Sequence, residues 1–260
     1  MTDKKKEVLK ELKGSYPDYV EKLNEMVKDP KSKALIDEAF GGDLGDMKLK
    51  MSIQDISAAA LMPTQNEIDV DKSLGYEMKP GADISAVWKE PITLKIPLVT
   101  YNGTFIIDGH HRWSQVACYN PNGMMKCMNF QGNASPIQVL KAVQGCIAAA
   151  EGEVPSSHVT GKNIYDMSKK DAEDFFNKNV TDSVYENLSK YIENQGKDDL
   201  ITKLVENIMM LQTDHPLMKY APERGVMPQT DKSKDANPNV EGSALNILAT
   251  KKVLKVPGNK

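Results

Sequence analysis

Five consecutive residues carry side chains that together could bind a phosphate group: Asp108, Gly109, His110, His111 and Arg112. They follow a β-rich run and precede an apolar helical pattern, so the sequence predicts a strand, a tight turn and a helix start. A helix start offers backbone N–H groups and the positive end of the helix dipole to an anion. Gly109 allows close approach to the backbone, and Arg112 can donate to two phosphate oxygens. We therefore expect an anion site at residues 108–112, most simply for the phosphates of a nucleotide.

Each of these residues also has an ordinary structural explanation. Asp108 could cap the helix, one histidine could pack in the core, and Arg112 could pair with a surface carboxylate. Packing gives no reason to gather an acid, a glycine, two imidazoles and a guanidinium within five residues, so function is the better explanation. A metal held by both histidines is disfavoured, because adjacent side chains diverge on a strand or a helix.

The elements around this loop mix strands and helices. The β-rich runs 92–101 and 104–107 are separated by an Asn-Gly pair, which is the strongest short signal for a hairpin. A helix is predicted from Ser135 to Ala150, with Pro136 as its first residue. Helical stripes follow over 168–194 and 199–211. We expect an α+β fold, with a small mixed sheet, helices, and helical additions at both ends.

Four parts of the chain differ in composition. We predict an N-terminal helical appendage (1–45), an α+β domain (46–152), a helical cap (153–215) and an extended C-terminal tail (216–260). The tail is rich in Pro, Asn, Lys and Gly and needs contact with something else to be held down. This indicates a protein partner, or a second copy of the chain in a homo-oligomer.

The overall composition excludes several classes of protein. Lys and Arg number 33 against 36 Asp and Glu, so the net charge of -3 provides no general attraction to nucleic acid or anionic lipid. The three cysteines lack metal-ligand or CxxC spacing, which favours reduced thiols in a cytoplasm. The charged N-terminus lacks the apolar core of a signal peptide, and no apolar run reaches the length of a membrane span. We expect a cytoplasmic protein without a membrane partner.

Two segments carry a resemblance to a known superfamily. Residues 105–113, with the sequence FIIDGHHRW, resemble the phosphate-binding box of the ParB/sulfiredoxin superfamily. Residues 61–68, LMPTQNEI, resemble the first, Pro/Gln-containing box of its ParB branch. The resemblance covers about residues 52–150 and implies a small α/β fold that cradles nucleotide phosphates. Members include a partition CTPase, nucleases, a cysteine sulfinic acid reductase and free-serine kinases.

Departures from the family patterns narrow the expected activity. His110 stands where the reductases place a nucleophilic cysteine, so reductase activity is not expected. Partition proteins carry Glu-Arg-Arg in the box and a helix-turn-helix downstream, and neither is evident here. The Asp-Gly-His-His-Arg form is most similar to the serine kinases and to phage ParB-like proteins often labelled nucleases. A phage-encoded chain would work in the host cytoplasm.

The first hypothesis that follows is a nucleotide-dependent hydrolase or phosphotransferase. Gly109 to Arg112 would hold the phosphates of ATP, ADP or CTP, because phosphoryl transfer mainly needs positioning and charge neutralisation. Asp108 and Glu67 would supply carboxylates for Mg²⁺ or a general base. The resemblance places Gln65 and Glu67 beside the box, and Lys72 would help to neutralise phosphate.

Two further hypotheses use the same loop. In a metal-dependent nuclease, the loop would bind a DNA phosphodiester, with His110 or His111 as the base and a divalent metal as the Lewis acid. In a non-enzymatic protein, the loop would be a nucleotide-gated switch on a DNA-binding or scaffold protein. The sequence leaves these three hypotheses open.

Overall fold

The structure is a computed structural model that describes residues 48–133, 135–151, 161–214 and 253–255, with a few isolated positions elsewhere. The predicted N-terminal appendage, residues 152–160 and most of the predicted tail lie outside the described residues. Among the residues described, no helix is long and apolar enough to cross a membrane.

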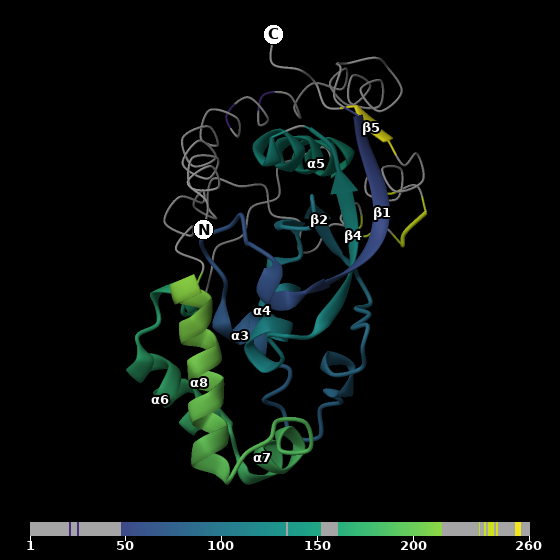
Figure 1. The fold of residues 1–260 in the computed structure, drawn as a ribbon. Coiled ribbons are helices and arrows are strands. Elements are labelled where there is room, and N and C mark those ends of the chain that lie inside the picture. Colours follow the sequence, from purple (N-terminus) through teal and green to yellow (C-terminus); the bar gives the residue numbers. More distant parts are fainter. Residues whose placement is uncertain are drawn as a thin grey trace.

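A five-stranded sheet forms the centre of the molecule (Figure 1). Its strand order is β3 (Phe105–Asp108), β2 (Leu98–Tyr101), β4 (Met124–Gln131), β1 (Lys48–Ser57) and β5 (Val253–Lys255). All neighbouring pairs are antiparallel except β2 and β4, which are parallel. The sheet is therefore mixed, and with its helices it confirms an α+β fold. The strand β5, from the predicted tail, extends the sheet at β1.

The predicted Asn-Gly hairpin is confirmed between β2 and β3. Asn102 and Gly103 have φ angles of 50° and 64°, the left-handed conformation that the two central residues of a type I′ turn require. Only the last four residues of the β-rich run 92–101 form a strand, and Ile92 instead makes an isolated parallel bridge to Met125. The hairpin ends at Asp108, the first residue of the expected anion site.

Helices and short 3-10 turns complete the fold. They are η1 (Ala58–Ala60), α3 (Val70–Leu74), η2 (Ser85–Val87), α4 (His110–Tyr119), α5 (Pro136–Glu151), η3 (Ile164–Asp166), α6 (Lys169–Asn179), α7 (Asp182–Leu188) and α8 (Lys197–Asp214). The expected start of a helix at Pro136 is confirmed. The stripe over 168–194 is divided into α6 and α7, because α6 ends at Asn179 with Val180 as its C-cap, and the side chain of Thr181 caps α7.

Apolar side chains fill both faces of the central strands. Successive strand residues point to opposite faces. Ile106 and Cys127 belong to one core cluster with Trp113 of α4, whereas Phe105 and Met128 are buried outside that cluster. The cluster continues from α4 into α6, α7 and α8, so these helices share a core with one face of the sheet. The helix α5 contacts β3.

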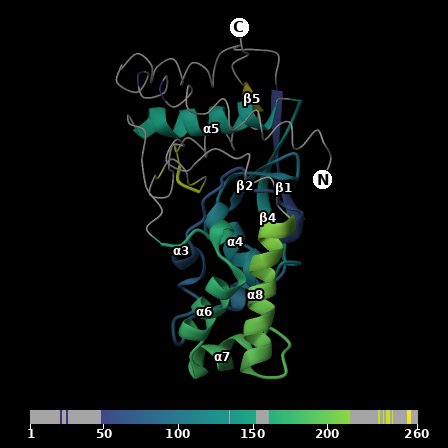
Figure 2. The ribbon, with the colours of Figure 1, turned by 90° about the vertical axis from the view of Figure 1, so that its left-hand side faces the viewer.

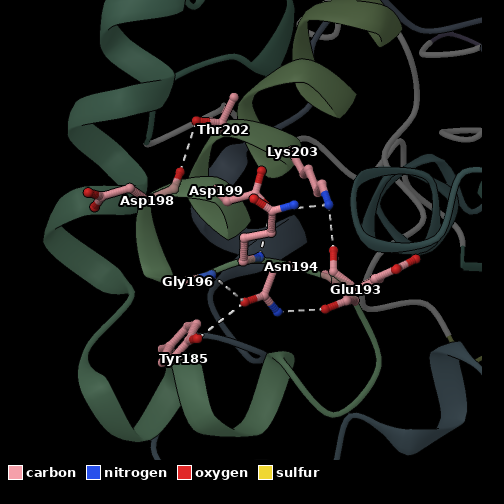
Figure 3. Close-up of polar contacts among 10 residues, drawn as sticks. Tyr185, Glu193, Asn194, Gly196, Asp198, Asp199, Thr202 and Lys203 are labelled. Atoms are coloured by element: carbon pink, nitrogen blue, oxygen red, sulfur yellow. Dashed lines mark hydrogen bonds and ion pairs between the residues drawn. The ribbon is translucent and has the colours of Figure 1, made fainter.

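The helices α6 to α8 gather at the end of the molecule opposite to α5, as Figures 1 and 2 show. Figure 3 shows the polar contacts at the corner between α7 and α8. Asn194 Oδ1 accepts from the Tyr185 hydroxyl at 3.2 Å and from the Gly196 amide at 3.1 Å. Lys203 pairs with Asp199 at 3.2 Å and donates to the Glu193 carbonyl at 2.6 Å. These contacts fix the start of α8, which packs against α4.

Candidate phosphate-binding site

The strand β3, the turn at Gly109 and the start of α4 follow one another as the sequence predicts. Gly109 occupies the N-cap position of α4 in the left-handed conformation, with φ of 100°, and no side chain caps the helix there. A Cβ atom at Gly109 would lie 2.5 Å from Leu98 Cδ2 and 2.8 Å from Arg112 Nη2. Glycine is needed here for its φ angle and because Leu98 and Arg112 occupy the space of a side chain.

Arg112 folds back over this turn. Its Nη2 donates to Asp108 Oδ2 at 2.9 Å and to the Pro97 carbonyl at 3.3 Å. Its Nε is buried and has no hydrogen-bond partner within the described part of the chain. A buried N–H without an acceptor is costly, so such a group is uncommon unless a ligand or water oxygen satisfies it. The guanidinium is thus held in place beside the helix start with one donor still to be satisfied.

The two histidines point to different places. His110 is 6% exposed, and its Nε2 accepts a hydrogen bond from the Thr64 amide at 3.0 Å. The Nε2 of His111 accepts a hydrogen bond from the Asp69 amide at 3.2 Å. The two rings therefore have different backbone partners. Across the described residues, no three His, Cys, Asp or Glu side chains are grouped to hold a metal ion.

The segment 62–70 lies along β3 and the first turn of α4. The Met62 amide donates to the Thr104 carbonyl at 2.7 Å, and the Ile106 amide donates to the Met62 carbonyl at 2.8 Å. This arrangement brings the segment that carries Gln65 and Glu67 to the loop. Gln65 is 8% exposed and donates to the Glu67 carbonyl, whereas the side chain of Glu67 is partly exposed. Lys72 is exposed on α3.

Asp69 joins the loop to two other segments, which the sequence analysis did not foresee. Its Oδ1 accepts from the Lys72 amide at 3.1 Å and so caps α3, while its Oδ2 accepts from the Gly161 amide at 3.0 Å. Asn163 adds contacts to the Ile68 amide and the Asn66 carbonyl. An Asp directly before a short helical pattern is a usable signal for the cap. The long-range contact to Gly161 has no such local signal.

A second buried acidic residue, Glu77, packs against the C-terminal half of α4. Gln115 donates to its Oε1, and its Oε2 has no partner among the described residues. Burial raises the pKa of Glu77 to about 7, and the hydrogen bond from Gln115 opposes this shift. Glu77 contacts the part of α4 that is remote from Gly109, so it does not belong to the loop.

The described cysteines are buried free thiols. They are Cys118 on α4 and Cys127 on β4. Burial raises the pKa of Cys127 to about 12, and burial followed by the nearby Glu77 charge raises the pKa of Cys118 well above its usual range. Both are therefore thiols at neutral pH and poor nucleophiles, which agrees with the expectation of reduced thiols.

No protein-family model, no curated protein and no solved structure matches this chain.

Proposed function

We propose that the protein binds the phosphates of a nucleotide at residues 108–112 and hydrolyses or transfers the terminal phosphoryl group, as in a ParB-like nucleotide-binding protein. The observation that carries the proposal is Arg112, whose buried Nε lacks an acceptor within the described residues while its Nη2 is fixed by Asp108 and Pro97. A phosphate oxygen would satisfy this donor if the Arg112 side chain turned its covered Nε toward the loop. Phosphoryl transfer depends mainly on such positioning and on neutralisation of charge.

The turn itself supports the same proposal. Gly109 is the N-cap of α4, and the first backbone N–H groups of a helix favour an anion at its start. The combination of a helix dipole with a held guanidinium favours an anion with several oxygens. We propose a nucleoside di- or triphosphate, such as ATP, ADP or CTP, as that anion because residues 105–113 resemble a nucleotide-phosphate box.

Magnesium would accompany the nucleotide in this proposal. The residues described do not form a three-ligand metal site, and Asp108 is already bonded to Arg112. Mg²⁺ bound to a nucleotide is held largely by phosphate oxygens and water. In this proposal Asp108 orients Arg112, and Glu67, on the segment 62–70, is the second candidate carboxylate.

A nucleotide-gated switch is the second candidate. The histidines of the loop contact the Thr64 and Asp69 amides, and Asp69 in turn contacts Gly161. A ligand that moves the start of α4 would therefore act on three segments that are distant in sequence. The same contacts weaken the nuclease hypothesis, because His110 and His111 are its candidate bases and the Nε2 atom of each already accepts a hydrogen bond from a backbone amide.

Calorimetric titration of ATP, ADP and CTP, with and without Mg²⁺, tests the proposal. We expect Arg112→Ala to weaken nucleotide binding by at least about tenfold, since a charge-assisted hydrogen bond is lost. Lys169→Ala, which removes an exposed cation of α6 paired with Glu173 at 4.0 Å, is the matched control and should bind as the wild type does. Equal and weak binding by all three proteins would refute the phosphate site.

Product assays then separate the activities. Serine-dependent release of a nucleoside mono- or diphosphate would favour a kinase, and release without serine a hydrolase. Cleavage of supercoiled or single-stranded DNA with Mg²⁺ or Mn²⁺ would favour the nuclease instead. Binding without any product would favour the switch.

A further inference from the structure

We infer that His110 and His111 are positioning residues whose neutral imidazoles, each protonated on Nδ1, clamp the segment 62–70 onto the phosphate loop. The clamp rests on the hydrogen bonds alone, whereas its effect on ligand binding rests on the proposed function.

The first half of the clamp is the contact between His110 and Thr64. The Thr64 amide donates to His110 Nε2 at 3.0 Å, and the Thr64 hydroxyl donates to the Ile106 carbonyl at 2.7 Å. The Thr64 hydroxyl oxygen also lies 3.3 Å from Nε2, but its own proton is directed to Ile106, so the group that donates a hydrogen bond to Nε2 is the amide. An imidazole nitrogen that accepts a hydrogen bond bears no hydrogen, so the proton of the neutral ring is on Nδ1. Thr64 is fully buried, which makes this bond costly to break.

The second half is the contact between His111 and Asp69. The Asp69 amide donates to His111 Nε2 at 3.2 Å, which places the proton of this ring on Nδ1 as well. The carboxylate of Asp69 accepts from the Lys72 and Gly161 amides, so the residue that meets His111 is itself fixed from two sides. Asp71 and Lys72 of α3 follow Asp69 in the chain, and the Asp108–Arg112 pair flanks His111 in the loop.

The two contacts enclose the residues that the proposed site needs from this segment. Gln65 and Glu67 lie between Thr64 and Asp69, and the Gln65 side chain bonds to the Glu67 carbonyl inside that interval. The positions of Gln65 and Glu67 relative to Gly109 therefore depend on both imidazoles. A proton placed on either Nε2 would face a backbone N–H and break the contact. The geometry assigns the histidines to holding the segment and not to removing a substrate proton through Nε2.

The tautomers can be read directly by long-range ¹H–¹⁵N correlation spectra of the full-length wild-type protein labelled on histidine. We expect the His110 and His111 rings to show the pattern of a neutral Nδ1–H tautomer at neutral pH. Spectra of His110→Gln and His111→Gln assign the signals. An Nε2–H pattern, or a doubly protonated ring at neutral pH, for either residue would overturn the inference.

Two substitutions at His111 separate a specific acceptor from general packing. Gln can place its carbonyl oxygen near the position of Nε2, whereas Asn can place its own only near Nδ1. We expect His111→Gln to keep the hydrogen exchange of the Asp69 amide within about threefold of the wild type, and His111→Asn to accelerate it by about tenfold or more. Equal exchange in both variants would contradict the clamp.

Binding of ATP and inorganic pyrophosphate to the same proteins tests the link to the site. His111→Gln should bind within about threefold of the wild type, and His111→Asn about tenfold more weakly. Rescue by Gln but not by Asn supports a positioning role, and loss of binding in both variants with an intact Asp69 contact contradicts it. If the wild type binds neither probe, the proposed function fails, while the tautomers and the exchange of Asp69 still decide the clamp.

Discussion

Gly109 has a left-handed backbone conformation, and the guanidinium of Arg112 packs directly against it. We expect Gly109→Ala to lower the free energy of unfolding by roughly 2–5 kcal/mol, because a left-handed alanine is strained and its Cβ would overlap two side chains. The substitution should also displace Arg112 and weaken nucleotide binding. Urea unfolding and calorimetry measure the two effects.

Gly81 provides the matched control for this substitution. Its φ is 74°, but no atom lies within 4 Å of the position of an added Cβ. Gly81→Ala should therefore cost only the backbone strain, about 1–2 kcal/mol, and leave binding unchanged. A Gly109→Ala protein that is no less stable than Gly81→Ala would show that the contacts of Leu98 and Arg112 do not constrain the turn.

Glu77 determines a pH dependence of stability. Its pKa is raised from 4.5 to about 7 in the folded chain, so the folded state keeps a proton that the unfolded state loses first. The contribution of this proton to the free energy of unfolding is complete below about pH 4.5. It is lost as the pH rises to about 7, and it amounts to at most about 3 kcal/mol. Glu77→Gln should remove this decline and be more stable than the wild type at pH 8.

Denaturant unfolding between pH 5 and 8 measures this effect. Glu186→Gln, at an exposed position of α7, is the control and should follow the wild-type profile. Parallel profiles for the wild type and Glu77→Gln would mean that the buried carboxyl does not keep its proton.

Elements whose conformation is determined by residues adjacent in the sequence could be predicted. The β2–β3 hairpin follows from the Asn-Gly pair, and the start of α5 follows from Ser135 and Pro136. The loop after β3 was predicted for the same reason, since a β-branched strand, a glycine and a helical pattern are adjacent. Even the bond between Asp108 and Arg112 joins residues one helical turn apart.

Elements that depend on distant residues could not be predicted in this way. The strand β4 lies between β1 and β2, and buried Asn129 on β4 bonds to Thr100, Gly103 and Gln54. The contacts of Asp69 and Asn163 likewise join segments more than ninety residues apart. Such pairings depend on which surfaces meet in the folded chain, and no spacing in the sequence encodes them.

At the scale of the whole molecule, one core connects the candidate site to the helices α6 to α8. Trp113 of α4, Phe176 of α6 and Leu204 of α8 belong to the same buried cluster, and Asn207 of α8 donates to the Cys118 carbonyl at 2.8 Å. The sheet, α4 and the three helices should therefore unfold together in a single transition. Independent unfolding of α6 to α8 would require this cluster to divide.

Leu204→Ala tests this connection from a position on a different helix from the phosphate loop. Leu204 is fully buried, so the substitution should cost about 2–5 kcal/mol. Because the core is shared, tryptophan fluorescence, which includes buried Trp113, and far-ultraviolet circular dichroism should shift together to lower urea concentrations. Met210→Ala removes a side chain of the same helix that is 40% exposed, and it should change stability by less than about 0.5 kcal/mol. If the loss of Leu204 instead split the transition, with fluorescence unchanged, the helices α6 to α8 would be a separate folding unit and their contact with α4 would contribute little to holding the phosphate loop.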